Sequence, residues 1–170
     1  MNFFELAKER YSCRMLTDKP IEPEKIERIL KAAIAAPTAK NFQPYKIWKI
    51  SSAEGLEKIK QVTNFTFGAK IILAVGVDTE RSFIRPFDEM NFADADGAIV
   101  GTHIILAVQS EGLGTTWVGY FDATKLRELI PEMKNYKMIA LFPIGYPAND
   151  AKPSNRHEER RKFSDVVTEI

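Results

Sequence analysis

Two arginines near the N-terminus stand where they could bind an anion together. The segment ERYSCR, residues 9–14, places Arg10, Ser12 and Arg14 at alternate positions. In an extended chain, alternate side chains lie on the same side, so two guanidinium groups and a hydroxyl would face one target. Phosphate suits this pattern, because a guanidinium matches its oxygens with paired hydrogen bonds. Ordinary solvent-exposed charge explains the same residues equally well.

A second basic group lies near the C-terminus. RHEERRK, residues 156–162, contains four cations: Arg156, Arg160, Arg161 and Lys162. They would close over the same anion if the tail folds back to residues 10–14. A solvated charged surface is the alternative, which composition alone favours for this group.

Two further segments suit a flat heteroaromatic ligand. The loop APTAKNFQP, residues 36–44, is bounded by prolines and offers the planar amides of Asn41 and Gln43 to the edge of a ring. In WVGY, residues 117–120, aromatic side chains flank Gly119, where a ligand can approach the backbone closely. A turn-forming asparagine and a kinked core strand are the respective alternatives.

Other common catalytic patterns are missing from the sequence. It contains no GxGxxG or Walker phosphate loop, no GxSxG turn and no Ser-His-Asp order. His103, His157 and Cys13 lack metal-ligand spacing, so no metal site is expected. Cys13 has no histidine near it in sequence to act as a base, and a small packing residue is the expectation.

Length and charge limit the class of protein. The 170 residues are enough for one domain, residues 1–170, with its own hydrophobic core. A single cysteine fits a reducing compartment, and the first twenty residues do not resemble a secretory signal, so the cytoplasm is expected. The 24 Lys and Arg balance 23 Asp and Glu, so we expect neither nucleic acid nor a membrane as a partner.

The hydrophobic pattern predicts the elements that would position these groups. A first helix starts at Asn2, with Glu5 three residues later, and ends near Arg10. A second runs from Glu22 to Ala36, with apolar residues at three- and four-residue spacings. The remaining expectations are strands over residues 45–51, 71–77 and 138–147, a short helix over 55–62, a short strand or extended segment over 115–121, and a helix capped by Asp122 that stops before Pro131.

The longest apolar stretch, residues 91–112, predicts a central core helix. Four polar side chains interrupt it well short of the roughly 18 apolar residues of a membrane span: Asp94, Asp96, His103 and Gln109. Gly97 and Gly101, one turn apart, would let another helix approach closely.

Taken in order, these segments resemble the nitroreductase family of flavin mononucleotide (FMN) enzymes. ERYSCRML resembles the family's Arg-x-Ser-x-Arg/Lys opening, APTAKNFQPYKI its Pro-Ser-x-x-Asn-x-Gln-Pro-Trp loop, and EGLGTTWVGYFD its Gly-Leu-Gly-Thr-x-Trp-x-Gly segment. GYP at residues 145–147 and the basic tail complete a resemblance over nearly the whole chain. There are departures: Tyr45 replaces the usual Trp, Thr38 the usual Ser, and residues 77–91 leave little chain to cover a substrate.

The resemblance implies an α+β fold, with a central mixed or antiparallel sheet flanked by helices, in a domain-swapped homodimer. Two FMN sites would lie in the subunit interface, and the long helix would form the dimer core. The implied FMN-binding residues are Arg10, Tyr11, Ser12, Arg14, Pro37, Thr38, Ala39, Asn41, Gln43, Asn64, Trp117, Val118, Gly119, Arg160 and Arg161.

The resemblance implies which part of the flavin each of these segments would contact. The N-terminal arginines, joined by Arg160 or Arg161, would hold the phosphate and ribityl end, and residues 37–41 would reach the flavin bound mainly by the other subunit. Asn64 would meet the pyrimidine edge. The backbone groups of Val118 and Gly119 would lie beside the reactive edge, with Trp117 and Tyr120 as walls.

The implied activity is ping-pong transfer of hydride from NADH or NADPH, through FMN, to a small acceptor such as a nitroaromatic or a quinone. No catalytic side chain is required. Arg14, or Lys40, would stabilise the reduced flavin. Two alternatives remain: a flavin-binding protein for storage or sensing without fast turnover, and the same fold performing flavin-independent or flavin-destroying chemistry.

Overall fold

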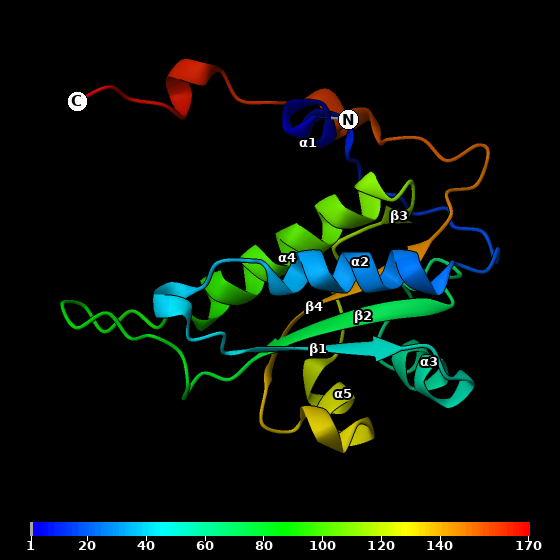
Figure 1. Cartoon of the computed structure of the whole chain (residues 1–170), viewed down its shortest axis with the longest axis horizontal. Coiled ribbons are helices and arrows are strands. Elements are labelled where there is room, and N and C mark those ends of the chain that lie inside the picture. The colour runs from blue at the N-terminus through cyan, green and yellow to red at the C-terminus, as the bar shows by residue number, and fades with distance from the viewer. Residues whose placement is uncertain (1) are drawn as a thin grey trace.

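A four-stranded antiparallel sheet lies at the centre of the computed structural model, which describes residues 2–170 (Figure 1). Its strands are β1 (Tyr45–Ile50), β2 (Ile71–Val77), β3 (Gly114–Thr115) and β4 (Lys137–Gly145), in the order β1-β2-β4-β3. The apolar runs of β2 and β4 are buried almost throughout, because both faces of the sheet are covered. The predicted α+β class with an antiparallel sheet is confirmed.

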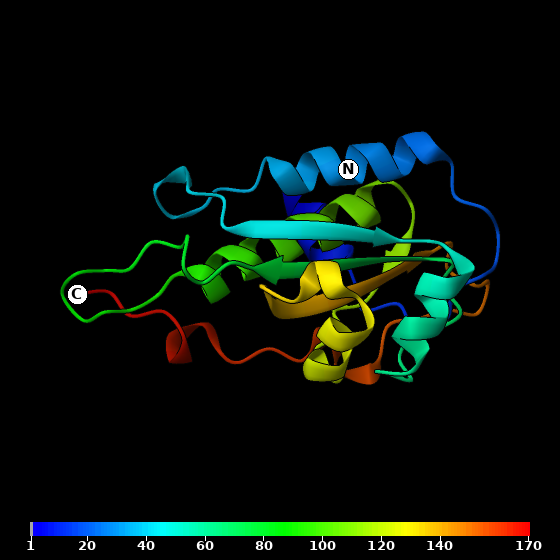
Figure 2. The same ribbon diagram turned by 90° about the horizontal axis from the view of Figure 1, so that it is seen from below.

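Helices cover the two faces in pairs (Figures 1 and 2). On one face lie α2 (Pro23–Ile34) and α4 (Ala93–Ser110), and on the other α3 (Ala53–Lys60) and α5 (Ala123–Leu129). Along β2, Leu73 and Val75 belong to the first hydrophobic core, whereas Ile72 and Ala74 belong to the second. This split follows from the alternation of side chains along a strand.

The N-terminal helix α1 (Phe3–Glu9) ends where the arginine segment begins. Its capping box is complete, since Asn2 accepts from the backbone of Glu5 and Glu5 accepts from the backbone of Asn2. At Arg10 the backbone is extended, with φ −58° and ψ 127°. No residue of α1 is buried, and Phe4 is 83% exposed.

The predicted helices and strands are present, and apart from β3 their ends differ from the expected ones by no more than two residues. In residues 115–121 only the first belongs to a strand, and the rest is extended chain tied to β4 by a bridge between Val118 and Leu141. Short 3-10 turns occupy Ala39–Asn41, Pro131–Met133, Asn155–Glu158 and Phe163–Asp165. No helix within residues 2–170 has the length and apolar character to cross a membrane.

The glycines of α4 face the sheet of their own chain. A Cβ atom at Gly97 would lie 2.8 Å from side-chain atoms of Ile139 and Val77, and one at Gly101 would lie 2.5 Å from the ring of Trp117. The expectation that they admit another helix is therefore wrong. Their small size instead lets α4 lie close to the sheet and to Trp117.

Two segments extend from this core. Residues 78–92, between β2 and α4, form a projecting arm, so the short segment does make an excursion (Figure 1). An isolated bridge between Ile84 and Asn91 closes the arm, and Phe87 within it is 93% exposed. The C-terminal tail, residues 149–170, runs past α1 along one side of the fold (Figure 1).

Candidate functional site

The N-terminal arginine segment and the C-terminal tail line one cavity of about 190 Å³, here called the arginine pocket. Its lining is Arg10, Tyr11, Ser12, Arg14, Ser154, Arg156, His157 and Arg160. The N–H of Cys13 donates to the carbonyl of Thr115 at 2.9 Å, which fixes the extended segment against β3. The Tyr11 ring meets the His157 ring edge-on at 6.5 Å between centroids. The tail thus returns to residues 10–14.

None of the four arginines in this pocket forms an ion pair with a carboxylate of residues 2–170. Among the described residues, Arg14 donates only to the carbonyl of Ser12, at 3.4 Å, and Arg160 only to two carbonyls of the tail, at 2.6 and 2.7 Å. Elsewhere, Arg28 binds both oxygens of Glu111 at 2.7 Å. Because like charges around a cavity repel, an anion that accepts several hydrogen bonds would stabilise this arrangement.

Tyr11 adds a hydroxyl donor to the same cavity. Burial raises the pKa of Tyr11 to about 12, with smaller contributions from the adjacent Cys13. The phenol therefore stays protonated at neutral pH and can donate to an anion. Cys13 itself is buried, with its thiol 3.5 Å from the carbonyl of Met15, as expected of a packing residue.

A second cavity, of about 180 Å³, shares Arg14 with the arginine pocket and is here called the aromatic pocket. It is lined by Arg14, Phe65, Phe67, Thr116, Trp117, Val118, Gly119 and Tyr120. The Phe65 ring lies 6.0 Å from the Phe67 ring and 5.8 Å from the Tyr120 ring, between centroids. The Thr63 hydroxyl donates to the carbonyl of Tyr120 at 2.8 Å and so links the chain segment of Phe65 and Phe67 to that of Tyr120.

Within the aromatic pocket, the backbone of Gly119 differs from that of its neighbour Val118. Both backbone groups of Val118 are paired with Leu141, at 2.9 and 3.0 Å, although the residue lines the pocket. The Gly119 N–H donates to no acceptor among the described residues. The Trp117 ring packs edge-on against Phe142 at 5.1 Å between centroids, above Gly101.

The loop of residues 37–43 lines neither pocket and lies at the start of α4. The Ala39 N–H donates to Oδ1 of Asp96 at 2.9 Å. Lys40, Asn41 and Gln43 have φ of 51°, 55° and 50°. This left-handed conformation costs a non-glycine residue on the order of 1 kcal/mol or more, although asparagine tolerates it best. The structure thus keeps Pro37, Thr38, Ala39, Asn41 and Gln43 apart from the other candidate residues of the same chain.

Three further candidates lie outside both pockets. Asn64 is exposed and lines neither, but its neighbours Phe65 and Phe67 line the aromatic pocket; the alternating aromatic residues of NFTF were the signal for them. Arg161 donates to the carbonyl of Asp165 at 2.7 Å instead of joining Arg160. The Lys40 ammonium lies 4.8 Å from the centre of the Phe83 ring.

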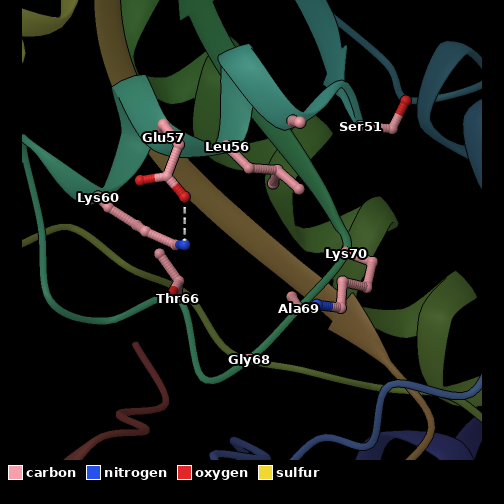
Figure 3. A pocket seen from close by; sticks show the side chains of 9 residues that line it. Ser51, Leu56, Glu57, Lys60, Thr66, Gly68, Ala69 and Lys70 are labelled. Carbon is pink, nitrogen blue, oxygen red and sulfur yellow. Dashed lines mark hydrogen bonds and ion pairs between the residues drawn. The ribbon is translucent and has the colours of Figure 1, made fainter.

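A larger groove, of about 380 Å³, lies on the other side of residues 65–68, between α3 and the chain that leads to β2 (Figure 3). Lys60 at its rim is already paired with Glu57 at 2.5 Å. Over residues 2–170 no group of three or more His, Cys, Asp or Glu side chains could hold a metal ion. The arginine and aromatic pockets are therefore the candidate site.

Comparison with known proteins identifies the family to which the chain belongs. The chain matches the model of the Nitroreductase family over residues 7–67 and 62–146. It is 33% identical over 150 residues to an Archaeoglobus fulgidus protein provisionally named NADH dehydrogenase/NAD(P)H nitroreductase, and the match covers 83% of each chain. A crystal structure of a nitroreductase family protein from Clostridium difficile 630 superposes with a TM-score of 0.91 at 36% identity, covering 99% of this chain and 98% of that one.

A structure from Exiguobacterium sibiricum 255-15, described as a provisional nitroreductase in complex with FMN, has the same fold. Its TM-score is 0.84 at 20% identity, and the superposition covers 100% of this chain and 98% of that one. The family match and the close structural relative together settle the family. The chain belongs to the nitroreductase family.

Proposed function

We propose that the protein is an FMN-dependent oxidoreductase that uses NADH or NADPH to reduce a small molecule such as a nitroaromatic or a quinone. The observation that carries the proposal is the arginine pocket: its four arginines have no carboxylate partner among the described residues, and Arg14 joins it to an aromatic pocket. A cationic end and an aromatic end in one continuous site match the chemistry of a flavin phosphate. Bound FMN supplies the redox chemistry, a ping-pong relay of hydride between nicotinamide and acceptor.

The arginine pocket would hold the phosphate. Arg10 and Arg14 would donate charge-assisted hydrogen bonds, with Arg160 in preference to Arg161 because only Arg160 lines the cavity. The hydroxyls of Ser12 and Tyr11 lie in the same lining and would add neutral donors.

The aromatic pocket would hold the ring. Trp117 provides a wall that Phe142 and Gly101 fix from behind, and Gly119 offers its free N–H to a ring heteroatom. Arg14 lies between the two cavities, where its charge would stabilise negative charge on the reduced ring. Asn64, next to the Phe65 wall, stays our candidate for the pyrimidine edge.

The loop of residues 37–43 would complete the site of a second subunit in a domain-swapped homodimer. Its separation from both pockets of its own chain supports this arrangement, and so does exposed apolar surface on three segments: Phe4 in α1, Ile99 in α4 and Phe163 in the tail. Each subunit would be one domain, and the end of the tail, residues 163–170, would fold onto its partner.

Anaerobic titration of the purified protein with NADH and with NADPH tests this function. We expect a yellow protein whose flavin absorbance is lost with one nicotinamide or both and returns on adding an acceptor. Flavin that neither nicotinamide reduces would favour storage or sensing. A protein that stays colourless after FMN is added, with no FMN bound, would overturn the proposal.

A further inference from the structure

Asp96 is a buried carboxylate with one hydrogen bond. It lies in the first turn of α4, and only 1% of its surface is exposed. Its Oδ1 accepts the N–H of Ala39, and its Oδ2 has no partner within residues 2–170. Burying a carboxylate is unfavourable unless the group is compensated. The position of Asp96 therefore calls for a role that an apolar residue could not fill.

Among the described residues, Asp96 is the one external hydrogen-bond partner of the loop that contains Asn41 and Gln43. Within the described chain, the bond between Ala39 and Asp96 is the only hydrogen bond that links residues 37–43 to another element. The other hydrogen bonds of these residues are internal: Asn41 N to Thr38 O, Phe42 N to Ala39 O, Gln43 N to Thr38 Oγ1, and Gln43 Nε2 to Asn41.

The loop needs such an anchor because its backbone is strained. Lys40, Asn41 and Gln43 all adopt the left-handed conformation, which persists only where the surroundings hold it. A carboxylate near the start of a long helix is well suited to hold it, because the positive end of the helix dipole favours negative charge there. Its bond to the Ala39 N–H is charge-assisted, hence stronger than a neutral one.

We propose that Asp96 is a positioning residue. By accepting the Ala39 N–H, it holds residues 37–43 in the conformation that exposes Asn41 and Gln43 to a ligand. The identity of that ligand, FMN, rests on the proposed function, whereas the anchoring does not. Asp94, two residues earlier on the same helix, provides a matched control, because it is exposed and pairs with Lys137 at 2.6 Å.

Hydrogen exchange of the full-length protein without added flavin tests the anchoring. The amides of Ala39, Asn41, Phe42 and Gln43 are all hydrogen-bonded and serve as reporters. In Asp96→Ala these amides should exchange about tenfold faster, with α4 and the sheet unchanged. In Asp96→Asn, which keeps an oxygen acceptor without the charge, the rise should be about threefold. Asp94→Ala should leave the loop unchanged.

Two exchange results would overturn the anchoring. One is unchanged loop exchange in Asp96→Ala, and the other is equal acceleration in the loop and the sheet, which marks a general loss of stability. If Asp96→Ala does not fold, Asp96→Asn decides, and loop exchange equal to that of the wild type refutes the proposal.

Binding of FMN tests the connection with the site. We expect the dissociation constant to rise about tenfold in Asp96→Ala and to recover most of the way in Asp96→Asn. Unchanged affinity in a variant with a loosened loop would refute the positioning role. If the wild type binds no FMN, the proposed function fails, and the exchange experiment alone decides whether Asp96 holds the loop.

Discussion

The arginine pocket and the loop of residues 37–43 are built in opposite ways. In the pocket, four guanidinium groups lack carboxylate partners within residues 2–170, and their hydrogen bonds go to a few backbone carbonyls. In the loop, the backbone is bonded internally, strained at three residues and anchored to a buried carboxylate. The pocket keeps positive charge that no carboxylate of the described residues neutralises, whereas the loop keeps a fixed backbone conformation.

This difference follows from what each region would bind. A phosphate attracts cations over several ångströms, so long arginine side chains can adjust to it after it arrives. The edge of a flat ring offers only short, directional hydrogen bonds, so groups that pair with it have to be in place beforehand. Substitutions in the two regions should therefore differ in how strongly they weaken binding and in which ligand they affect.

The largest effect should follow the loss of both N-terminal arginines. In Arg10→Ala/Arg14→Ala, two charge-assisted contacts of about 1.5–3 kcal/mol each are removed, so the dissociation constant of FMN should rise at least about 100-fold. The melting temperature should not fall, because like charges are removed from a cavity. Quenching of FMN fluorescence measures the affinity. Lys8→Ala, an exposed change in α1, serves as the control, and unchanged affinity in the double variant would show that the phosphate is placed wrongly.

Riboflavin, which lacks the phosphate, separates the two regions. The wild type should prefer FMN over riboflavin by about 100-fold, and this preference should fall below about tenfold in the double arginine variant. Riboflavin affinity should fall far less than FMN affinity, because of the two arginines only Arg14 also lines the aromatic pocket. A double variant that loses riboflavin as strongly as FMN would mean that the arginines act through the fold and not through a phosphate.

A smaller effect should follow from the loop. Gln43→Ala removes one neutral hydrogen bond of roughly 1 kcal/mol, so the dissociation constants of FMN and riboflavin should rise by the same factor, about fivefold. Gln61→Ala, an exposed glutamine at the end of α3, should change neither. If the variant lost affinity for FMN and kept its affinity for riboflavin, the assignment of the loop to the ring would be contradicted.

The smallest effect concerns Arg28, which already pairs with the carboxylate of Glu111. The hydrogen bonds from Arg28 hold the pKa of the Glu111 carboxyl below its ordinary value of 4.5. Because the folded pKa is lowered, this contribution to stability is present above pH 4.5 and is lost as the pH falls through the folded pKa.

Arg28→Ala should therefore lower the melting temperature slightly at pH 7, and the difference should disappear at low pH. FMN affinity should stay the same, which is the reverse of the pattern for the pocket arginines. Equal melting temperatures at pH 7 would mean that this exposed pair contributes nothing measurable, as many surface pairs do.

Local signals in the sequence predicted most of the fold. The capping box of Asn2 and Glu5, the apolar run of β2 and the cap at Asp122 depend on residues that are neighbours in the chain, and each is present in the structure. The return of the tail to residues 10–14 was left open in the sequence, because it depends on packing over more than a hundred residues.

The features of the site that the sequence did not predict have the same origin. Nothing near Gly101 in sequence indicates that it faces Trp117, and nothing near Val118 indicates that Leu141 takes up both of its backbone groups. Arg160 and Arg161 are adjacent and equally basic, and only the path of the tail separates their roles. These features depend on contacts between elements that the local pattern does not specify.

Helix α4 gives the two regions a common mechanical support. Asp96, which anchors the loop, and Gly101, which lies behind Trp117, are five residues apart, or roughly 7.5 Å along a helix. An α-helix is stiff over that length, so a shift of α4 along its axis would carry both anchors equally. In a dimer whose loops serve the opposite subunits, a push on one α4 would thus be transmitted to both sites, which makes this helix a natural route for one site to affect the other.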